Sequence, residues 1–261
     1  LATPLNGGTG WTNNWTAVNA ATGTVNNSSP LNSGGTYLTY QGTGGQTRSV
    51  YRVMDGTALD FSGTHQISFT WRADNLTNFS NSSDRFEFYN ATAAAPTGFD
   101  STDGTNTSSY LFGLFGANRG SSTTGEFAVY NPSRSGSDDG DNFNESSYGN
   151  LGVVGDASSG SALSVVAGTT YEVVIDLRPD EKKWDLWISD GTNTAWSTGL
   201  NFWGDGTTQE RLAFGTRGNN SSDTRTASLD SISVVPEPAS TQLLLGLAAL
   251  GGLILLRRKS R

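Results

Sequence analysis

Trp187, Asp176 and Asp185 are the side chains of this sequence whose types best suit ligand recognition: one aromatic ring and two carboxylates. An exposed indole can stack on the C–H face of a sugar ring, while carboxylates beside it accept hydrogen bonds from the sugar's hydroxyl groups. These residues therefore predict a carbohydrate-binding site. The alternative is an ordinary solvated face, on which water screens the two carboxylates or a cation or proton lies between them.

Two strands must bring these residues together. Tyr171–Leu177 and Trp184–Ser189 each alternate apolar and polar residues, which is typical of strands that bury one face. If the segments pair as a hairpin with their apolar faces matched, Asp176 lies opposite Asp185. The alternative is a register displaced by two residues. The pairs expected in the matched register are Leu177 with Trp184, Asp176 with Asp185, Ile175 with Leu186, Val174 with Trp187, and Val173 with Ile188.

A second acidic stretch, residues 138–145, contains Asp139, Asp141 and Glu145 close together. Hard oxygen ligands in such a pattern could wrap Ca²⁺, and Asp230 near the end of the body is a further candidate ligand. The spacing is not that of an EF-hand. The alternative is a water-exposed acidic loop and an ordinary aspartate near a turn. Apart from this Ca²⁺ site, the sequence indicates no cofactor.

Catalytic patterns are absent from the sequence. It contains no Cys and a single histidine, His65, which we expect to be structural, so a thiol nucleophile and a multi-His metal site are excluded. Glu172 and Asp176 share one strand face, but four residues of strand separate them by roughly 13 Å. Glycosidases place their two carboxyl groups roughly 5–9.5 Å apart. The sequence therefore predicts a protein that is not an enzyme.

The composition favours an all-β body. Charged residues make up only 15% of the chain, Gly accounts for 33 of 261 residues, and the formal net charge is −8. This mixture favours short strands joined by polar turns, and the acidic excess argues against nucleic-acid binding. We expect an antiparallel two-sheet β-sandwich or jelly roll over residues 1–234. Besides the hairpin, the candidate strands are 37–40, 49–54, 66–72, 85–89, 110–115, 126–131, 163–166, 212–216 and 228–234.

The end of the chain has a different composition. Leu243–Leu256 is apolar on every side, and a helix over 239–256 would be roughly 27 Å long, close to the thickness of a bilayer core. The basic tail 257–261 would remain in the cytoplasm and stop transfer. We expect a single transmembrane helix, and the alternative is a buried C-terminal helix of a soluble domain. The basic residues are Arg257, Arg258, Lys259 and Arg261.

The tripeptide Pro236-Glu237-Pro238 precedes the apolar span and the basic end. This order resembles the PEP-CTERM sorting signal of Gram-negative bacteria, over residues 235–261. The resemblance implies export, arrest in the inner membrane through the helix, and recognition by an exosortase. It also implies a final place at the cell surface or in the extracellular matrix, in association with polysaccharide and biofilm. Since the chain opens at Leu1 without an initiator Met, we expect its signal peptide to have been lost.

The body resembles concanavalin A/laminin-G-like sandwiches. The resemblance rests on the hairpin Tyr171–Ser189, which is followed by Asp190-Gly191, and on the closing strand Leu229–Val234. The opening segment Gly7–Trp11 also resembles sandwiches carried by exported PEP-CTERM proteins. It implies a jelly roll with a sugar-binding face, although this fold hosts many functions. Laminarinase-type hydrolases among these sandwiches carry a Glu-x-Asp-x-x-Glu strand motif, which this chain lacks.

These features predict an exported, exosortase-sorted surface or matrix protein that is not catalytic and that associates with or binds extracellular polysaccharide. Two alternatives remain: a secreted glycan-active enzyme, such as a glycoside hydrolase, on the same sandwich, and a structural coat or adhesion module. Glycan binding that depends on Trp187 distinguishes the first interpretation from the coat module. Release of reducing sugar that depends on Asp176 or Asp185 identifies the enzyme.

Overall fold

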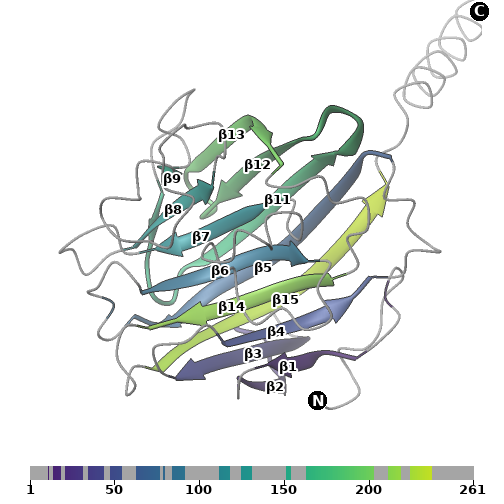
Figure 1. Ribbon diagram of the computed structural model, residues 1–261. Coiled ribbons are helices and arrows are strands. Elements are labelled where there is room, and N and C mark those ends of the chain that lie inside the picture. Colours follow the sequence, from purple (N-terminus) through teal and green to yellow (C-terminus); the bar gives the residue numbers. More distant parts are fainter. Residues whose placement is uncertain are drawn as a thin grey trace, which may run out of the picture.

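In the computed structural model, two antiparallel sheets face each other as a β-sandwich (Figure 1). Among the described residues the helical structure is limited to the 3₁₀ turn η4 (Pro179–Glu181), so the predicted all-β sandwich is confirmed. The predicted transmembrane helix 239–256 and the tail 257–261 lie outside the described residues. Within the described part of the chain, no helix has the length and apolar character needed to cross a membrane. The described residues are 11, 14–18, 21–31, 35–43, 48–54, 63–76, 79, 84–91, 112–117, 125–130, 151–153, 163–202, 211–218 and 224–236.

One sheet has seven strands within the described residues and carries the predicted hairpin at one edge. Its neighbouring strands are antiparallel throughout. In order across the sheet they are β13 (Thr194–Asn201), β12 (Lys183–Ser189), β11 (Thr170–Arg178), β5 (His65–Asn75), β15 (Thr224–Pro236), β3 (Thr36–Thr43) and β2 (Thr22–Asn27).

The facing sheet has eight strands within the same residues. Its order is β1 (Thr16–Val18), β4 (Arg48–Val53), β14 (Arg211–Arg217), β6 (Arg85–Ala91), β7 (Gly113–Ala117), β8 (Gly125–Tyr130) and β10 (Ser164–Val165), and β9 (Leu151–Val153) pairs with β8 off this path. Every predicted strand overlaps an observed one. The sequence did not predict β1, β2, β9 or β13, which are short or lack a regular alternation of apolar and polar residues.

Aromatic rings fill the space between the sheets. Trp71 of β5 is fully buried and contacts Phe86 and Phe88 of β6 edge-on, with ring centroids 5.0 and 5.1 Å apart. Phe69 meets Phe214 of β14 in the same manner, at 5.1 Å. Each such pair adds about 0.5–1.5 kcal/mol to the burial of the rings themselves. The alternation read from the sequence of β5 therefore identifies the inward face correctly.

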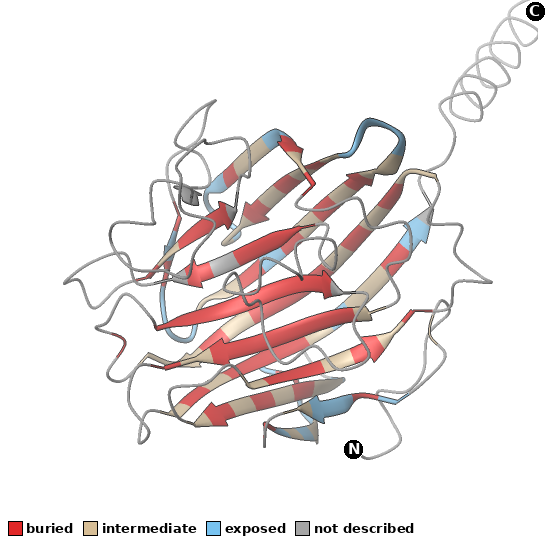
Figure 2. Cartoon of the chain, in the orientation of Figure 1, coloured by how far each residue is buried: buried red, intermediate tan, exposed pale blue. Residues whose placement is uncertain are grey.

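The middle strands of the eight-stranded sheet are buried on both faces. Figure 2 shows β6 and β14 buried almost throughout, whereas strands of the other sheet alternate between buried and partly exposed residues. Phe86 and Phe88 face the core, yet Arg85, Glu87 and Tyr89 on the opposite side of β6 are at most 1% exposed. Arg85 Nε donates a hydrogen bond to Glu87 Oε1 at 2.6 Å, so each buried charge has a partner.

A second buried ion pair connects β15 to the segment before β6. Arg225 Nη2 lies 2.9 Å from Asp84 Oδ1, and both side chains are 1% exposed. The guanidinium also lies over the ring of Phe79, 5.5 Å from its centroid. Since a buried charge that loses its partner costs about 3–5 kcal/mol, this contact strongly constrains the start of β15.

β15 lies between β5 and β3 and is, with 13 residues, the longest strand of the described residues. Its last two residues, Val235 and Pro236, lie opposite Gln66 and His65. The first proline of the predicted sorting tripeptide therefore belongs to the last strand of the sandwich, and the tripeptide's other two residues lie outside the described residues. His65 is buried beside this strand end, with Nδ1 2.7 Å from the carbonyl oxygen of Gly63.

Candidate functional site

The hairpin of β11 and β12 has the predicted register, with Asp176 opposite Asp185 and Val174 opposite Trp187. The turn η4 joins the two strands, and Lys182 completes it in the left-handed conformation, with φ of 53°. A one-residue slip would expose every apolar side chain of the hairpin, so burial of its inner face excludes that slip. The alternative register, displaced by two residues, is not the one observed.

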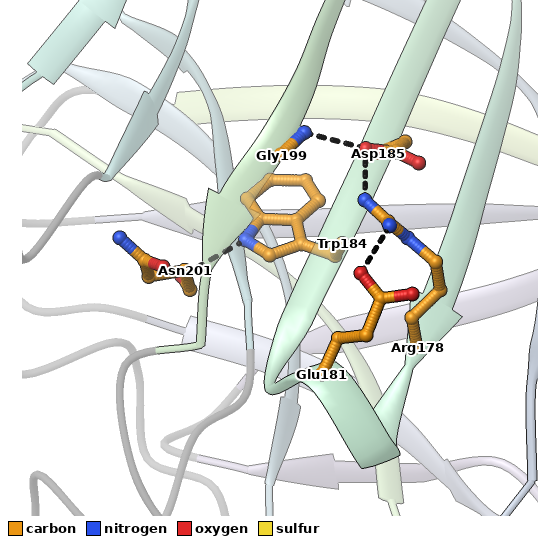
Figure 3. Close-up of polar contacts among 6 residues, drawn as sticks. All are labelled: Arg178, Glu181, Trp184, Asp185, Gly199 and Asn201. Atoms are coloured by element: carbon orange, nitrogen blue, oxygen red, sulfur yellow. Dashed lines mark hydrogen bonds and ion pairs between the residues drawn. The ribbon is translucent and has the colours of Figure 1, made fainter.

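Asp185 lies at a β-bulge between β12 and β13. Trp184 pairs with Leu200 and Leu186 with Ser197, so β13 has one more residue than β12 in this interval. The extra residue allows Gly199, with φ of 68°, to donate its backbone N–H to Asp185 Oδ1 at 2.6 Å (Figure 3). The Asp185 side chain therefore helps to hold β13 against β12 at the bulge.

Arg178 is the cation at the paired carboxylates. Its Nη2 lies 2.9 Å from Asp185 Oδ1, and its Nη1 lies 2.5 Å from Glu181 Oε2 in the turn (Figure 3). Asp176 has a separate partner, because its Oδ1 accepts a hydrogen bond from Gln66 Nε2 at 3.0 Å. The structure thus shows a cation bound to Asp185, whereas Asp176 accepts its hydrogen bond from a neutral side chain.

Trp187 lies on the outward side of β12, where it is partly exposed. Its cross-strand partner on β13 is Trp196, which is also partly exposed. The two indoles thus occupy neighbouring positions on one face of the sheet, about 4.8 Å apart in strand spacing. Sequence reasoning missed Trp196 because it did not identify β13, although an isolated Trp in a segment rich in Ser and Thr is the kind of signal that could have found it.

Glu172 is exposed on the same face of β11, two residues from Val174. Asp176 lies two residues from Val174 in the other direction, so the row containing both indoles has a carboxylate on each side. Four residues of strand place the two carboxylates roughly 13 Å apart, as expected from sequence. That separation suits contacts to different parts of an extended ligand better than an acid–base pair on one bond.

Asp230, proposed as a calcium ligand, already accepts a hydrogen bond at each carboxylate oxygen. Ser29 Oγ donates to Oδ2 at 2.8 Å, and the backbone N–H of Ser231 donates to Oδ1 at 2.6 Å. Ser231 has a φ of 54° at a bulge of β15. Asp230 therefore stabilises the bulge, and the described residues contain no cluster of three or more metal-ligating side chains. The other proposed ligands, Asp139, Asp141 and Glu145, lie outside the described residues.

No protein-family model matches the sequence, and no curated protein matches it. Among solved structures, the chain is similar to a conserved carbohydrate esterase from Shiga toxin-encoding bacteriophage phi24B, at 12% identity and a TM-score of 0.51, over 86% of this chain and 90% of that one. It is also similar to a sialidase, at 13% identity and a TM-score of 0.46, over 77% of this chain. An alginate lyase has 12% identity and a TM-score of 0.46, over 76% of this chain and 74% of that one.

These similarities concern the fold. The chain spans only 15% of the length of the sialidase, and all three identities are far below the level at which activity is shared. The likeness to the carbohydrate esterase shows a shared fold and carries no activity or ligand over to this chain. The residues that would contact a sugar must be argued from this chain itself.

Proposed function

We propose that this protein is a non-catalytic, exported surface or matrix protein that binds extracellular polysaccharide through the outward face of β11, β12 and β13. The observation that carries the proposal is the pair Trp187 and Trp196, neighbours on one sheet face with carboxylates on either side. Partly exposed indoles stack on sugar rings, and charged oxygens nearby orient the hydroxyl groups. The likeness to a carbohydrate esterase supports a sandwich fold that suits sugars.

Binding to a glycan array by the full chain in nonionic detergent tests this proposal. Trp187→Ala and Trp196→Ala should each weaken binding about tenfold or more, as expected for aromatic residues at the centre of a binding surface. Tyr37→Ala is the matched control, because Tyr37 is a partly exposed aromatic residue of β3, which lies four strands from β12 and five from β13 on the same sheet. Retention of full affinity by both tryptophan variants would refute this site.

The second part of the proposal concerns location. The apolar segment 239–256 anchors the protein in the inner membrane, and an exosortase recognises the signal that contains Pro236. Because the chain has no cysteine, a single introduced thiol reports its own position. In cells with a permeabilised outer membrane, an impermeant maleimide should label Thr198→Cys on the exposed part of β13. Ser260→Cys in the basic tail should react only after lysis, and the opposite pattern contradicts the proposed orientation.

Two further expectations have simple tests. A glycan-active enzyme would release reducing sugar from a polysaccharide that the protein binds, and we expect none. Calcium binding through Asp139, Asp141 and Glu145 stays a prediction from sequence. If Ca²⁺ binds the folded chain, EDTA should lower the melting temperature, because a ligand that binds only the native state stabilises it.

A further inference from the structure

We infer that the polysaccharide bound at the Trp187 and Trp196 face carries protonated amino groups. This inference rests on the proposed function and adds the chemical class of the ligand. The inference is based on the charges that surround the two indoles. Glu172 borders the row on one side, and Asp176 and Asp185 border it on the other, each two residues of strand, roughly 6.5 Å, from the row.

The cations on this face are displaced from the indoles. Arg178 and Lys183 lie opposite each other at the turn end of the hairpin, and Arg178 lies four residues, roughly 13 Å, from the row along β11. Arg178 is already bound by Asp185 and Glu181, at 2.9 and 2.5 Å. Its charge is therefore directed into the turn instead of toward the two indoles.

The neighbouring strand places no charge beside the indoles. On β5 the residues that continue the rows of Asp176, Val174 and Glu172 are Gln66, Ser68 and Thr70, and all three are neutral. Arg72 lies one row beyond Glu172, opposite Thr170, and its charge is paired with Asp74 on the same strand at 2.6 Å. The whole chain has a net charge of −8. Both the local and the overall field therefore attract a cationic chain and repel a polymer of uronic acids.

An ammonium group interacts favourably with both the indole rings and the carboxylates of this surface. A cation above the face of an indole is attracted by the ring's quadrupole, and a carboxylate beside it adds a Coulomb attraction. A sugar whose amine is acetylated keeps the stacking but loses both ionic contributions. We expect a preference of about tenfold for the free amine over its acetylated counterpart, which corresponds to about 1.4 kcal/mol.

Calorimetry with oligosaccharides of equal length tests the inference. The full chain in nonionic detergent is titrated with a glucosamine oligomer, an N-acetylglucosamine oligomer and a galacturonate oligomer. The buffer, at about pH 5.5, keeps the amines protonated and lies above the ordinary pKa values of Asp and Glu, roughly 3.9 and 4.3. The expected affinity order is glucosamine, then N-acetylglucosamine, then galacturonate. Raising the salt concentration should weaken glucosamine binding most.

Charge variants identify the residues responsible. Glu172→Gln and Asp176→Asn should each reduce the preference for glucosamine several-fold, because losing the charge weakens glucosamine binding more than N-acetylglucosamine binding. Asp180→Asn is the matched control, since Asp180 is an exposed carboxylate in the turn and not beside the indoles. The preference of this control variant for glucosamine over N-acetylglucosamine should equal that of the unmodified chain. A preference that survives both test variants overturns the assignment of these carboxylates.

The outcomes separate this inference from the proposed function. Equal binding of glucosamine and N-acetylglucosamine oligomers, lost in Trp187→Ala, overturns the amine inference and supports glycan binding. Absence of binding to every oligosaccharide overturns both. Glucosamine binding that persists in Trp187→Ala and is matched by oligolysine indicates charge attraction without a sugar site, and also overturns both.

Discussion

Asp176 and Asp185 face each other across the hairpin, yet neutralising them should have opposite effects on stability. Asp185 Oδ1 accepts hydrogen bonds from Arg178 and from Gly199 N–H, at 2.9 and 2.6 Å. Asparagine keeps an acceptor there but no charge, and hydrogen bonds to charged groups contribute about 1 kcal/mol more than neutral ones. Because the Asp185 and Arg178 side chains are 15% and 28% exposed, we expect Asp185→Asn to cost about 1–2 kcal/mol.

Asp176→Asn removes a like charge that lies directly opposite Asp185. The amide oxygen can still accept the hydrogen bond from Gln66, so this contact is retained. Relief of an opposed pair of like charges contributes about 0.2–1 kcal/mol, and we expect the variant to be equal to the unmodified chain or more stable by that amount. The two substitutions change the same side chain in the same way, so each serves as a control for the other.

Urea unfolding of the full chain in nonionic detergent measures the difference between the two variants. We expect the free energies of unfolding to differ by about 1–3 kcal/mol, which corresponds to a melting temperature difference of roughly 2–12 °C for a chain of this size. In 1 M salt, where the Debye length is about 3 Å, the gain from Asp176→Asn should shrink. If Asp176→Asn is as destabilising as Asp185→Asn, the division of roles between the two carboxylates is wrong.

Three further predictions concern the core. Arg225→Met should cost about 3–5 kcal/mol in urea unfolding, with partial recovery in the double variant that also contains Asp84→Leu, because the second change removes the unpaired buried charge. Gly42→Ala should lower the melting temperature, since its Cβ would lie 2.2 Å from Thr216 Oγ1; an unchanged value contradicts this close packing. Burial raises the pKa of Tyr171 above its ordinary value of 10.0. The contribution of its protonated hydroxyl to the free energy of unfolding is therefore intact below about pH 10. At higher pH this contribution is lost, by up to about 1.4 kcal/mol per pH unit. In Tyr171→Phe the free energy of unfolding should fall less steeply above pH 10. If the variant and the unmodified chain show the same dependence on pH, the buried hydroxyl is not its cause.

The hairpin could be predicted residue by residue because each of its strands has one apolar face. Burial of Ile175 and Leu186 excludes a one-residue slip, and of the two registers left open by the sequence the structure has the one that places Asp176 opposite Asp185. The neighbouring strand β13 could not be predicted in this way. Its bulge at Gly199 interrupts the alternation, and a bulge depends on the partner strand as much as on its own sequence.

The positions of the candidate site residues were predictable, but their contacts were not. Sequence identified Trp187 and both aspartates, and the structure places them on one face. It could not show that Asp185 binds Arg178, because that contact depends on the shape of the turn. Nor could it reveal Trp196, whose place beside Trp187 follows from the pairing of β13. Pairings between strands far apart in the sequence determine such details, and they leave little trace in local patterns.

The place of β15 between β5 and β3 has a consequence for how the molecule matures. Synthesis proceeds from the N-terminus, so β5 and β3 must wait for the final strand of the sandwich before that sheet can close. A polypeptide interrupted before Thr224 would leave two long hydrogen-bonding edges open and prone to association. Closure of this sheet is therefore tied to the arrival of Thr224–Pro236, the segment that supplies both missing sets of hydrogen bonds.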